Sequence, residues 1–219
     1  MKLFLKLVLF LQLMLLFQCK SSSNMDIENT HYSNDNINKY SGNSGFFIDK
    51  RDGNKYKWVK IDGQIWMAEN LRYRTDTGSV AYKYSKRYIG RFGYLYNGKT
   101  AQIVCPKGWH LPTKQEYEGL CKFLGNNIHD VFDALNNNDN IGFNSINAGS
   151  YNANTDKYRK SYFFRLEEYW TATICYTDSL GANDYNSFII NYFRKIALVG
   201  EYGRNGVYYY YPIRCIKND

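Results

Sequence analysis

The chain has 219 residues and a formal net charge of +8 at pH 7, with 44% hydrophobic and 18% aromatic residues. This length suits one medium-sized domain and excludes a multidomain machine. The apolar content can supply a packed core, which excludes a disordered, collagenous or coiled-coil chain. Tyrosine is in excess, with 22 residues, and the Gly and Asn content favours strands and turns over an all-helical fold.

The first 18 residues have the pattern of an export signal. Two lysines precede an apolar run from Leu7 to Phe17, which is shorter than the roughly 20 residues that a membrane-spanning helix needs. Cys19 follows, which resembles the lipobox of bacterial lipoproteins, although Gln18 stands where a small residue is usual. We therefore expect a lipoprotein signal peptide over residues 1–18, and lipidation of Cys19 that anchors the protein in the outer membrane or at the cell surface. An ordinary cleaved signal and an uncleaved anchor are the alternatives.

Residues 19–45 are rich in Ser and Asn and contain few apolar side chains. Such a segment cannot bury enough surface to offset the entropy that it would lose on folding. We therefore expect a flexible tether over residues 19–45 and a folded domain over residues 46–219. His31 and Asp35 lie in the tether, where a polar linker explains them more simply than a metal site does.

Apolar and polar residues alternate from Phe46 onward, around the turn signals Asp52-Gly53 and Asp62-Gly63. This pattern predicts that the domain opens with a β-meander of paired strands. The residues expected on the buried faces are Tyr56, Trp58, Ile61, Ile65 and Met67.

The rest of the domain combines helical and strand patterns. Thr113 and Glu116 have capping-box spacing, and apolar residues recur at helical intervals from Tyr117 to Leu124 before Gly125. This predicts one amphipathic helix, and residues 129–135 predict a second, shorter helix. Strands are predicted over residues 187–193, 195–202 and 207–217. Together these elements predict an α+β fold of twisted antiparallel sheets with one or two short helices.

Five motifs occur in a characteristic order along the chain. They are DGQIWMAENL from Asp62, YLYNG from Tyr94, CPKGWHLPTKQEYE from Cys105, YWTAT from Tyr169, and the closing IRCIKND. With these motifs, residues 46–219 resemble the Fibrobacter succinogenes major paralogous domain family. The resemblance implies an exported, often lipid-anchored bacterial domain with a C-type-lectin-like fold. This fold is related to that of the formylglycine-generating enzymes, and most members have no assigned activity.

Four cysteines remain when Cys19 is set aside, and four cysteines allow three pairings. The family resemblance implies a disulfide between Cys105 and Cys215. Cys121 falls on the apolar face of the predicted helix, which favours a buried thiol over a reactive one. A second disulfide between Cys121 and Cys175 stays open.

Common catalytic and cofactor signatures are absent from the sequence, including HExxH, CxxC, GxSxG, GxGxxG and the Walker loop. His110 lies in the segment GWHLP, where no nucleophile or carboxylate has a readable relation to it, so a structural role is favoured. The adjacent Glu167 and Glu168 would point apart on a strand, so we expect both to be solvated. The calcium-binding EPN, QPD and WND tripeptides of sugar-binding lectins are also missing. We predict no catalytic residue, no metal site and no cofactor.

Basic residues alternate with tyrosines between Arg72 and Arg91, in RYRTDTGSVAYKYSKRYIGR. Such a segment can follow a nucleic-acid backbone and stack bases, or it can face an anionic glycan or lipid headgroups. A solvated loop is the simpler interpretation. Because exported proteins rarely meet nucleic acid, we predict no nucleic-acid partner.

The segment Ile174–Pro212 is depleted in Trp, Met, Gln, Lys and Glu. Lys195 and Glu201 alone represent this set there, whereas the set supplies 25 of the 128 residues from 46 to 173. An AAC-type Asn codon that is randomised at its adenines cannot yield these five residues, and retroelements diversify some proteins with the lectin-like fold in this way. The segment is therefore a candidate diversified variable region. Aromatic strands and Asn/Gly turns produce the same depletion without diversification, so both explanations stand.

Four consecutive tyrosines, Tyr208 to Tyr211, cannot all be buried on one side of a strand, so some of their rings must point outward. Tyrosine suits contact surfaces because it offers a large area at a small entropy cost. We therefore predict a non-catalytic module that binds a glycan or protein ligand through aromatic residues. The alternatives are an enzyme related to the formylglycine-generating fold and a structural surface protein. The predicted ligand-binding residues are Tyr176, Tyr185, Tyr192, Tyr202, Tyr208, Tyr209, Tyr210 and Tyr211.

Overall fold

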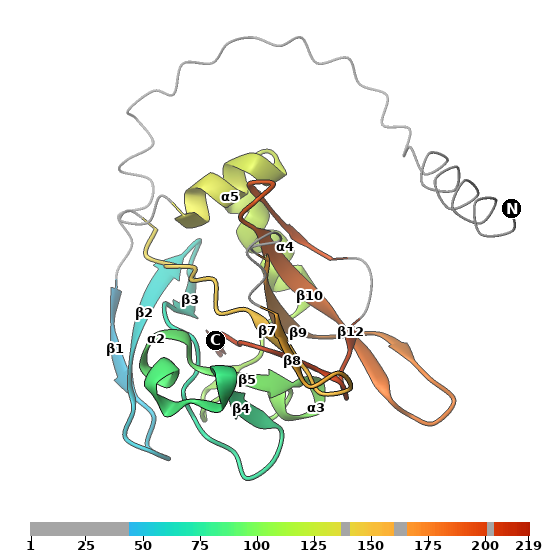
Figure 1. The fold of residues 1–219 in the computed structure, drawn as a ribbon. Helices are drawn as coiled ribbons and strands as arrows, with labels where there is room; N and C mark the ends of the chain where they lie inside the picture. Colours follow the sequence, from blue (N-terminus) through green and yellow to red (C-terminus); the bar gives the residue numbers. More distant parts are fainter. Residues whose placement is uncertain (1–43, 137–140, 160–165, 201–203) are drawn as a thin grey trace, which may run out of the picture. The chain divides into compact units, whose positions relative to one another are not determined.

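Three antiparallel sheets and several short helices make up the part of the chain that the computed structural model describes (Figure 1). The described residues are 44–136, 141–159, 166–200 and 204–219. They belong to the second of two units of the chain, residues 35–219. The predicted α+β class is confirmed. The predicted signal peptide, the lipidation site at Cys19 and Tyr202 lie outside the described residues.

The first sheet contains the predicted meander. Its hairpin turns depend on left-handed backbone conformations, with φ of +75° at Gly53, +47° at Asp62 and +81° at Gly63. The first strand begins at Ser44, two residues before the predicted boundary. Gly45 fits there because a Cβ at this position would lie 2.6 Å from the Trp58 ring. The strands are β1 (Ser44–Ile48), β2 (Lys55–Ile61), β3 (Gln64–Met67), β14 (Ile216–Lys217) and β6 (Trp109–His110), in this spatial order.

Both faces of β2 and β3 are buried, because a separate apolar core lies on each face. Val59 and Trp66 belong to one core, whereas Tyr56 and Met67 belong to the other. Of the predicted face, Tyr56, Ile61 and Met67 are buried, but Trp58 and Ile65 are only half-buried. The prediction is therefore confirmed for three of its five residues, and the cores on both sides of these strands explain why burial does not follow strict alternation.

Two consecutive helices cover the first core. In α4 (Lys114–Leu124), the Thr113 hydroxyl accepts from the Glu116 N–H, and the Glu116 carboxylate accepts from the Thr113 N–H. This confirms the predicted capping box, and the helix ends before Gly125 as predicted. The second predicted helix is α5 (Ile128–Asn136). Both helices pack apolar side chains into the first core, namely Tyr117, Leu120, Leu124, Val131, Phe132 and Leu135.

The second sheet joins the cores and carries a long hairpin. It has the order β11 (Ile196–Val199), β10 (Asn183–Asn191) and β12 (Arg204–Asn205), and β9 (Leu166–Thr177) also pairs with β10. Figure 1 shows the turn between β9 and β10, in orange, reaching beyond β12. The strand predicted over residues 187–193 begins earlier than predicted, at Asn183. The strand predicted over residues 195–202 corresponds to β11.

The third sheet brings distant segments together. Its order is β4 (Ser79–Ala81), β5 (Tyr94–Asn97), β13 (Tyr209–Tyr211), β7 (Ser150–Asn152) and β8 (Lys157–Arg159). The strand predicted over residues 207–217 is thus split between β13 and β14, with Pro212 after β13 because proline cannot donate to a ladder. Four short helices complete the fold: η2 (Tyr82–Tyr84), η3 (Lys86–Tyr88), α2 (Ile89–Phe92) and α3 (Gly98–Ala101).

Candidate functional site

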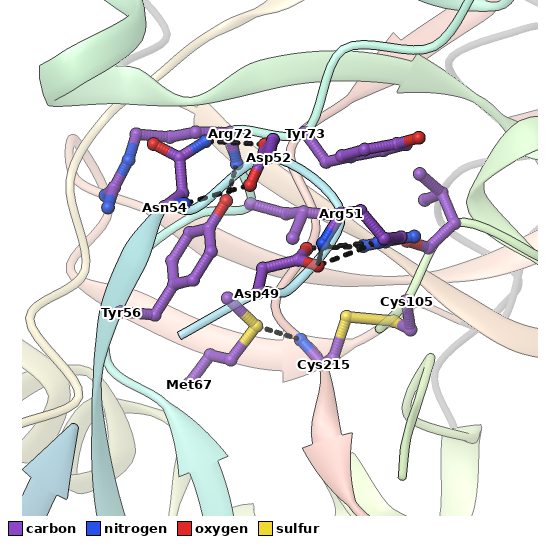
Figure 2. Close-up of polar contacts among 12 residues, drawn as sticks. Asp49, Arg51, Asp52, Asn54, Tyr56, Met67, Arg72, Tyr73, Cys105 and Cys215 are labelled. Atoms are coloured by element: carbon purple, nitrogen blue, oxygen red, sulfur yellow. Dashed lines mark hydrogen bonds and ion pairs between the residues drawn. A yellow bond between two sulfur atoms is a disulfide. The ribbon is translucent and has the colours of Figure 1, made fainter. Parts of the chain in front are cut away.

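Cys105 and Cys215 form a disulfide with a Cα–Cα distance of 5.9 Å, which confirms the pairing implied by the resemblance (Figure 2). Beside it, the Arg51 guanidinium donates two hydrogen bonds to the Asp49 carboxylate, of 2.6 and 2.9 Å, one to each oxygen. Arg51 also donates to the Val104 carbonyl at 2.8 Å. The β1–β2 turn is therefore fastened to the residue that precedes the disulfide.

A cluster of tyrosine rings lies on one face of the third sheet. Tyr210 on β13 is paired with Tyr151 on β7, and Tyr151 is paired with Tyr158 on β8. Because paired residues on neighbouring strands point to the same face, their rings meet, with centroids 5.3 and 4.7 Å apart. Tyr84 packs edge-on against two of them, at 5.9 Å from Tyr151 and 5.1 Å from Tyr158. We call Tyr84, Tyr151, Tyr158 and Tyr210 the tyrosine surface.

A carboxylate at the edge of the tyrosine surface holds two of the rings in place. The Tyr84 and Tyr151 hydroxyls both donate to Oδ1 of Asp156, at 2.6 and 3.1 Å. These hydrogen bonds lower the pKa of Asp156 and raise that of Tyr84, because they favour the charged carboxylate and the neutral phenol. Asp156 is fully exposed and therefore stays ionised near neutral pH.

The backbone at Tyr84 adopts an unfavourable conformation. Lys83 and Tyr84 are consecutive non-glycine residues with φ of +52° and +51°. The left-handed conformation costs roughly 1–2 kcal/mol per residue, so neighbouring contacts must compensate for it. The Tyr158 hydroxyl accepts from the Tyr84 N–H at 3.3 Å and itself donates to the Ala81 carbonyl at 3.0 Å. Such strain is concentrated at functional sites in proteins, which marks Tyr84 as a candidate site residue.

Glu167 and Glu168 are buried, so the expectation that they face solvent was wrong. The β9 residues from Glu167 to Thr171 are covered on both faces of the strand. Glu167 accepts from the hydroxyls of Ser145, Tyr169 and Tyr192 at 2.7, 2.7 and 2.9 Å, and burial raises its pKa. Glu168 forms an ion pair of 2.9 Å with Arg204. Both carboxylates therefore belong to the internal framework of the domain.

His110 contacts a carboxylate that the sequence pattern did not indicate. Its Nδ1 lies 2.7 Å from the Asn218 side-chain oxygen, and its Nε2 lies 2.8 Å from Glu116 Oε1. Burial opposes ionisation of Glu116, but hydrogen bonds from Thr113 and His110 outweigh it and lower the Glu116 pKa. The imidazole therefore links the N-terminus of α4 to the residue that follows β14.

The motifs that carried the resemblance all contribute to this framework. Trp170 Nε1 donates to the Tyr96 carbonyl at 2.7 Å, and the fully buried Arg214 donates to Asn70 Oδ1 at 2.9 Å. A family model described as the Fibrobacter succinogenes major domain matches residues 59–217, well over half of the chain. The chain belongs to this family. No curated protein and no solved structure matches it.

In this Fibrobacter succinogenes major domain, the predicted tyrosines have different environments. Tyr176 and Tyr208 are 60% and 46% exposed, and Tyr209 and Tyr210 are half-buried. The prediction that some rings of Tyr208–Tyr211 point outward is therefore confirmed. The structure adds Tyr84, Tyr151 and Tyr158 beside Tyr210. The basic, tyrosine-rich pattern between Arg72 and Arg91 signalled Tyr84, but no pattern indicated where it would pack.

Three predicted contact residues are instead committed to internal contacts. Tyr211 is 2% exposed, with its ring 4.7 Å from that of Trp170, because its side of β13 faces the second core. Tyr185 is 6% exposed and lies under Gly98 and Gly206, where any Cβ would clash with its ring. Tyr192 is half-buried and donates to Glu167. The prediction that Tyr185 and Tyr211 contact a ligand was therefore wrong. The Tyr192 hydroxyl is engaged in an internal hydrogen bond.

The other two cysteines of the domain remain free thiols, so the second disulfide is not formed. Cys121 is half-buried, and burial raises its pKa to about 12. It is therefore protonated near neutral pH and has little nucleophilic character. Cys175 is exposed on β9.

Neither a metal cluster nor a membrane span is found within the ranges that the structure describes. No group of three or more His, Cys, Asp and Glu side chains there could hold a metal ion. No helix in the same ranges has the length and apolar character that crossing a membrane requires.

Proposed function

We propose that this domain is a non-catalytic binding module that holds a glycan on the tyrosine surface. The observation that carries the proposal is that Tyr84 is 63% exposed, although neighbours fix its ring, hydroxyl and backbone. A ring that is exposed and already ordered loses little entropy when a ligand packs against it. The electron-rich face of such a ring attracts the polarised C–H groups of a sugar.

Asp156 supplies the polar half of the proposed site. Its Oδ1 accepts from the two tyrosine hydroxyls, whereas Oδ2 receives no hydrogen bond from the described part of the chain. An ionised oxygen with a free lone pair is a strong acceptor for a sugar hydroxyl. A few polar groups beside apolar rings are the usual composition of a small-ligand site. Asp156 and Tyr84 therefore suit a ligand with both C–H faces and hydroxyl groups.

The size of the surface favours a glycan over a protein ligand. A stable protein interface covers about 800 Å² on each partner and centres on buried apolar residues. The tyrosine surface has four rings and one exposed carboxylate at its edge. A short stretch of sugar units fits this arrangement better than a protein face does.

We further propose that the module is exported and anchored through a lipid on Cys19, in the outer membrane or at the cell surface. The Cys105–Cys215 disulfide supports export, because structural disulfides persist mainly in oxidising compartments. The family match, together with short helices beside antiparallel sheets, supports a C-type-lectin-like fold. Mass spectrometry of the exported protein tests the acylation. Recovery of Cys19 as an unmodified thiol would overturn the proposed lipid anchor.

Binding on a glycan array tests the proposed function. We expect the wild-type protein to select a set of glycans, and the Tyr84→Ala and Tyr210→Ala variants to lose them. The matched control is Tyr176→Ala, which removes an equally exposed ring from the β9–β10 hairpin. Equal retention by all three variants, or equal loss, would overturn the proposal. Selection of cell-surface proteins in place of glycans would reassign the surface to a protein ligand.

A second candidate, a structural protein that assembles with further copies, is favoured by one feature. The β9–β10 hairpin exposes three apolar side chains, with Ile174, Tyr176 and Leu180 between 50% and 92% exposed. Sedimentation of the purified protein separates the two candidates. Concentration-dependent association that Leu180→Ser abolishes would support assembly, whereas a monomer at all concentrations would count against it.

A further inference from the structure

A cleft of about 340 Å³ lies apart from the tyrosine surface and shares no lining residue with it. Its walls come from β1, β2, the segment after β3 and the short helix α2, and Arg214 contributes from the C-terminal segment. This volume is at the lower end of the range for small-ligand sites. The cleft can therefore hold one small ring or a single substituent of a larger ligand.

Positive charge dominates the lining of the cleft. Four cationic side chains contribute to it, Lys57, Arg72, Arg91 and Arg214, together with one carboxylate, that of Glu69. Both oxygens of this carboxylate are already occupied, since Oε1 accepts from Arg72 at 2.9 Å and Oε2 accepts from the Lys57 backbone N–H at 2.6 Å. Glu69 thus positions the cleft wall and leaves an excess of positive charge.

Two of the guanidinium groups are fixed in advance of any ligand. Arg72 stacks over the Tyr56 ring at 4.4 Å and donates to Glu69 and to the Lys55 carbonyl. Arg214 donates to Asn70 and to the carbonyls of Phe143 and Asn144. A guanidinium carries five N–H donors, so Arg72 has donors beyond these contacts, whereas Arg214 is fully buried and adds charge behind the cleft wall without touching a ligand. A fixed guanidinium with spare donors, as in Arg72, is suited to planar oxyanions such as carboxylates.

The rim of the cleft adds two further positive charges and one aromatic ring. Arg91 is exposed, and the Lys57 ammonium has no hydrogen bond or ion pair among the described residues. Phe46 lines the same cleft and is 60% exposed. An exposed ring beside cations matches a molecule that has both an apolar face and a negative group.

We infer that this cleft binds the carboxylate of an acidic sugar, a uronic acid unit within a glycan. Arg72, Arg91 and Lys57 face the carboxylate, and Phe46 packs against the C–H face of the sugar ring. Because the cleft and the tyrosine surface have no residue in common, the inference holds whether or not the tyrosine surface binds a neutral glycan.

Calorimetric titration of the full-length protein tests the inference with three probes: trigalacturonate, its neutral methyl ester, and inorganic sulfate. We expect trigalacturonate to bind about tenfold more tightly than the methyl ester. Its affinity should fall in 0.5 M NaCl, because salt screens exposed charges. Phe46→Ser should lower the affinity for trigalacturonate and leave the affinity for sulfate unchanged. If sulfate binds as tightly as trigalacturonate, the cleft accepts free anions, and the assignment to a sugar fails.

Charge-matched variants locate the binding. Lys57→Gln and Arg91→Gln remove rim charges that make no hydrogen bond or ion pair in the described part of the chain, and each should weaken trigalacturonate about fivefold to tenfold. Lys60→Gln, on the same strand as Lys57, and Arg74→Gln remove the same charge outside the cleft. Equal weakening by the cleft and control variants would show non-specific attraction and overturn the inference. Absence of binding by the wild-type protein, or equal binding of the acid and its ester, would overturn it as well.

Discussion

The family motifs and the tyrosine surface occupy two regions of the domain with opposite physical character. The motif residues Trp66, Trp170 and Arg214 are fully buried and bind backbone groups or pack in the cores. The tyrosine surface lies outside these motifs in sequence, and two of its hydroxyls bind the exposed Asp156. The motifs therefore define a scaffold, whereas the proposed contact residues lie on segments that the scaffold presents.

The two regions also differ in the way they depend on chain connectivity. The disulfide closes a sequence separation of 110 residues, and Arg214 reaches residues more than 70 positions away. Loss of a framework contact should therefore lower the free energy of unfolding of the whole domain. Loss of a surface ring should mainly lower the affinity for the ligand.

The largest effect is expected for Cys215→Ser, which opens the disulfide. In the chain-entropy model, a loop of this length stabilises the folded state by about 4 to 5 kcal/mol. Urea denaturation of the oxidised wild type and of the variant measures the change in unfolding free energy. Cys175→Ser, which removes a free thiol, is the control, and an equal effect of both variants would contradict the prediction.

The next largest effect is expected for Trp170→Ala. This change removes a fully buried ring and leaves the Tyr96 carbonyl without its donor, at a cost of about 3 to 5 kcal/mol. Tyr84→Ala, on the tyrosine surface, should cost about 1 kcal/mol or less in the same urea experiment. If Tyr84→Ala destabilises as much as Trp170→Ala, the division into framework and surface is wrong.

A smaller effect distinguishes the ring of Tyr84 from its hydroxyl. Tyr84→Phe keeps the ring and removes the hydrogen bond to Asp156, so affinity for an array-selected glycan should fall about threefold. Tyr84→Ala removes the contact face as well, and the fall should be about tenfold or more. Calorimetric titration measures both, and the same affinity for both variants would show that the ring makes no contact with the ligand.

The smallest effect is a dependence on acid pH. The Asp156 pKa is lowered from 3.8, so its carboxylate contributes fully above that value, and the contribution disappears as pH falls through the folded-state pKa. Glycan affinity should therefore be constant from pH 7 to pH 5 and weaken only below about 4. Asp156→Asn should bind more weakly and lose this acid dependence. A midpoint near pH 6 in the wild type would assign the dependence to another group.

Local signals were sufficient for part of the fold. The Asp62-Gly63 turn and the cap formed by Thr113 and Glu116 depend on neighbours in sequence, and both formed as predicted. The Cys105–Cys215 bond was implied by the family, since three pairings were equally compatible with the cysteine count. Alternation could not predict the burial of Glu167, because β9 is covered on both faces there. It could not predict the burial of Tyr211 either, because Tyr211 packs into a core built from distant segments.

The tyrosine surface lay beyond sequence reasoning for the same reason. Tyr84 meets Tyr151 and Tyr158 across 67 and 74 residues of chain. The C-terminal tyrosine run indicated an aromatic surface, but only the pairing of β13 with β7 shows which of its rings joins that surface. The diversification of Ile174–Pro212 remains a prediction, which a template repeat near the coding sequence would test.

Ring-selective NMR of labelled tyrosines during titration with an array-selected glycan is the most direct test of the tyrosine surface. We expect the ring signals of Tyr84, Tyr151 and Tyr210 to shift on binding, while those of the buried Tyr185 and Tyr211 stay in place. Shifts confined to Tyr176 on the hairpin, or no shift in any of the four surface rings, would contradict the proposed function.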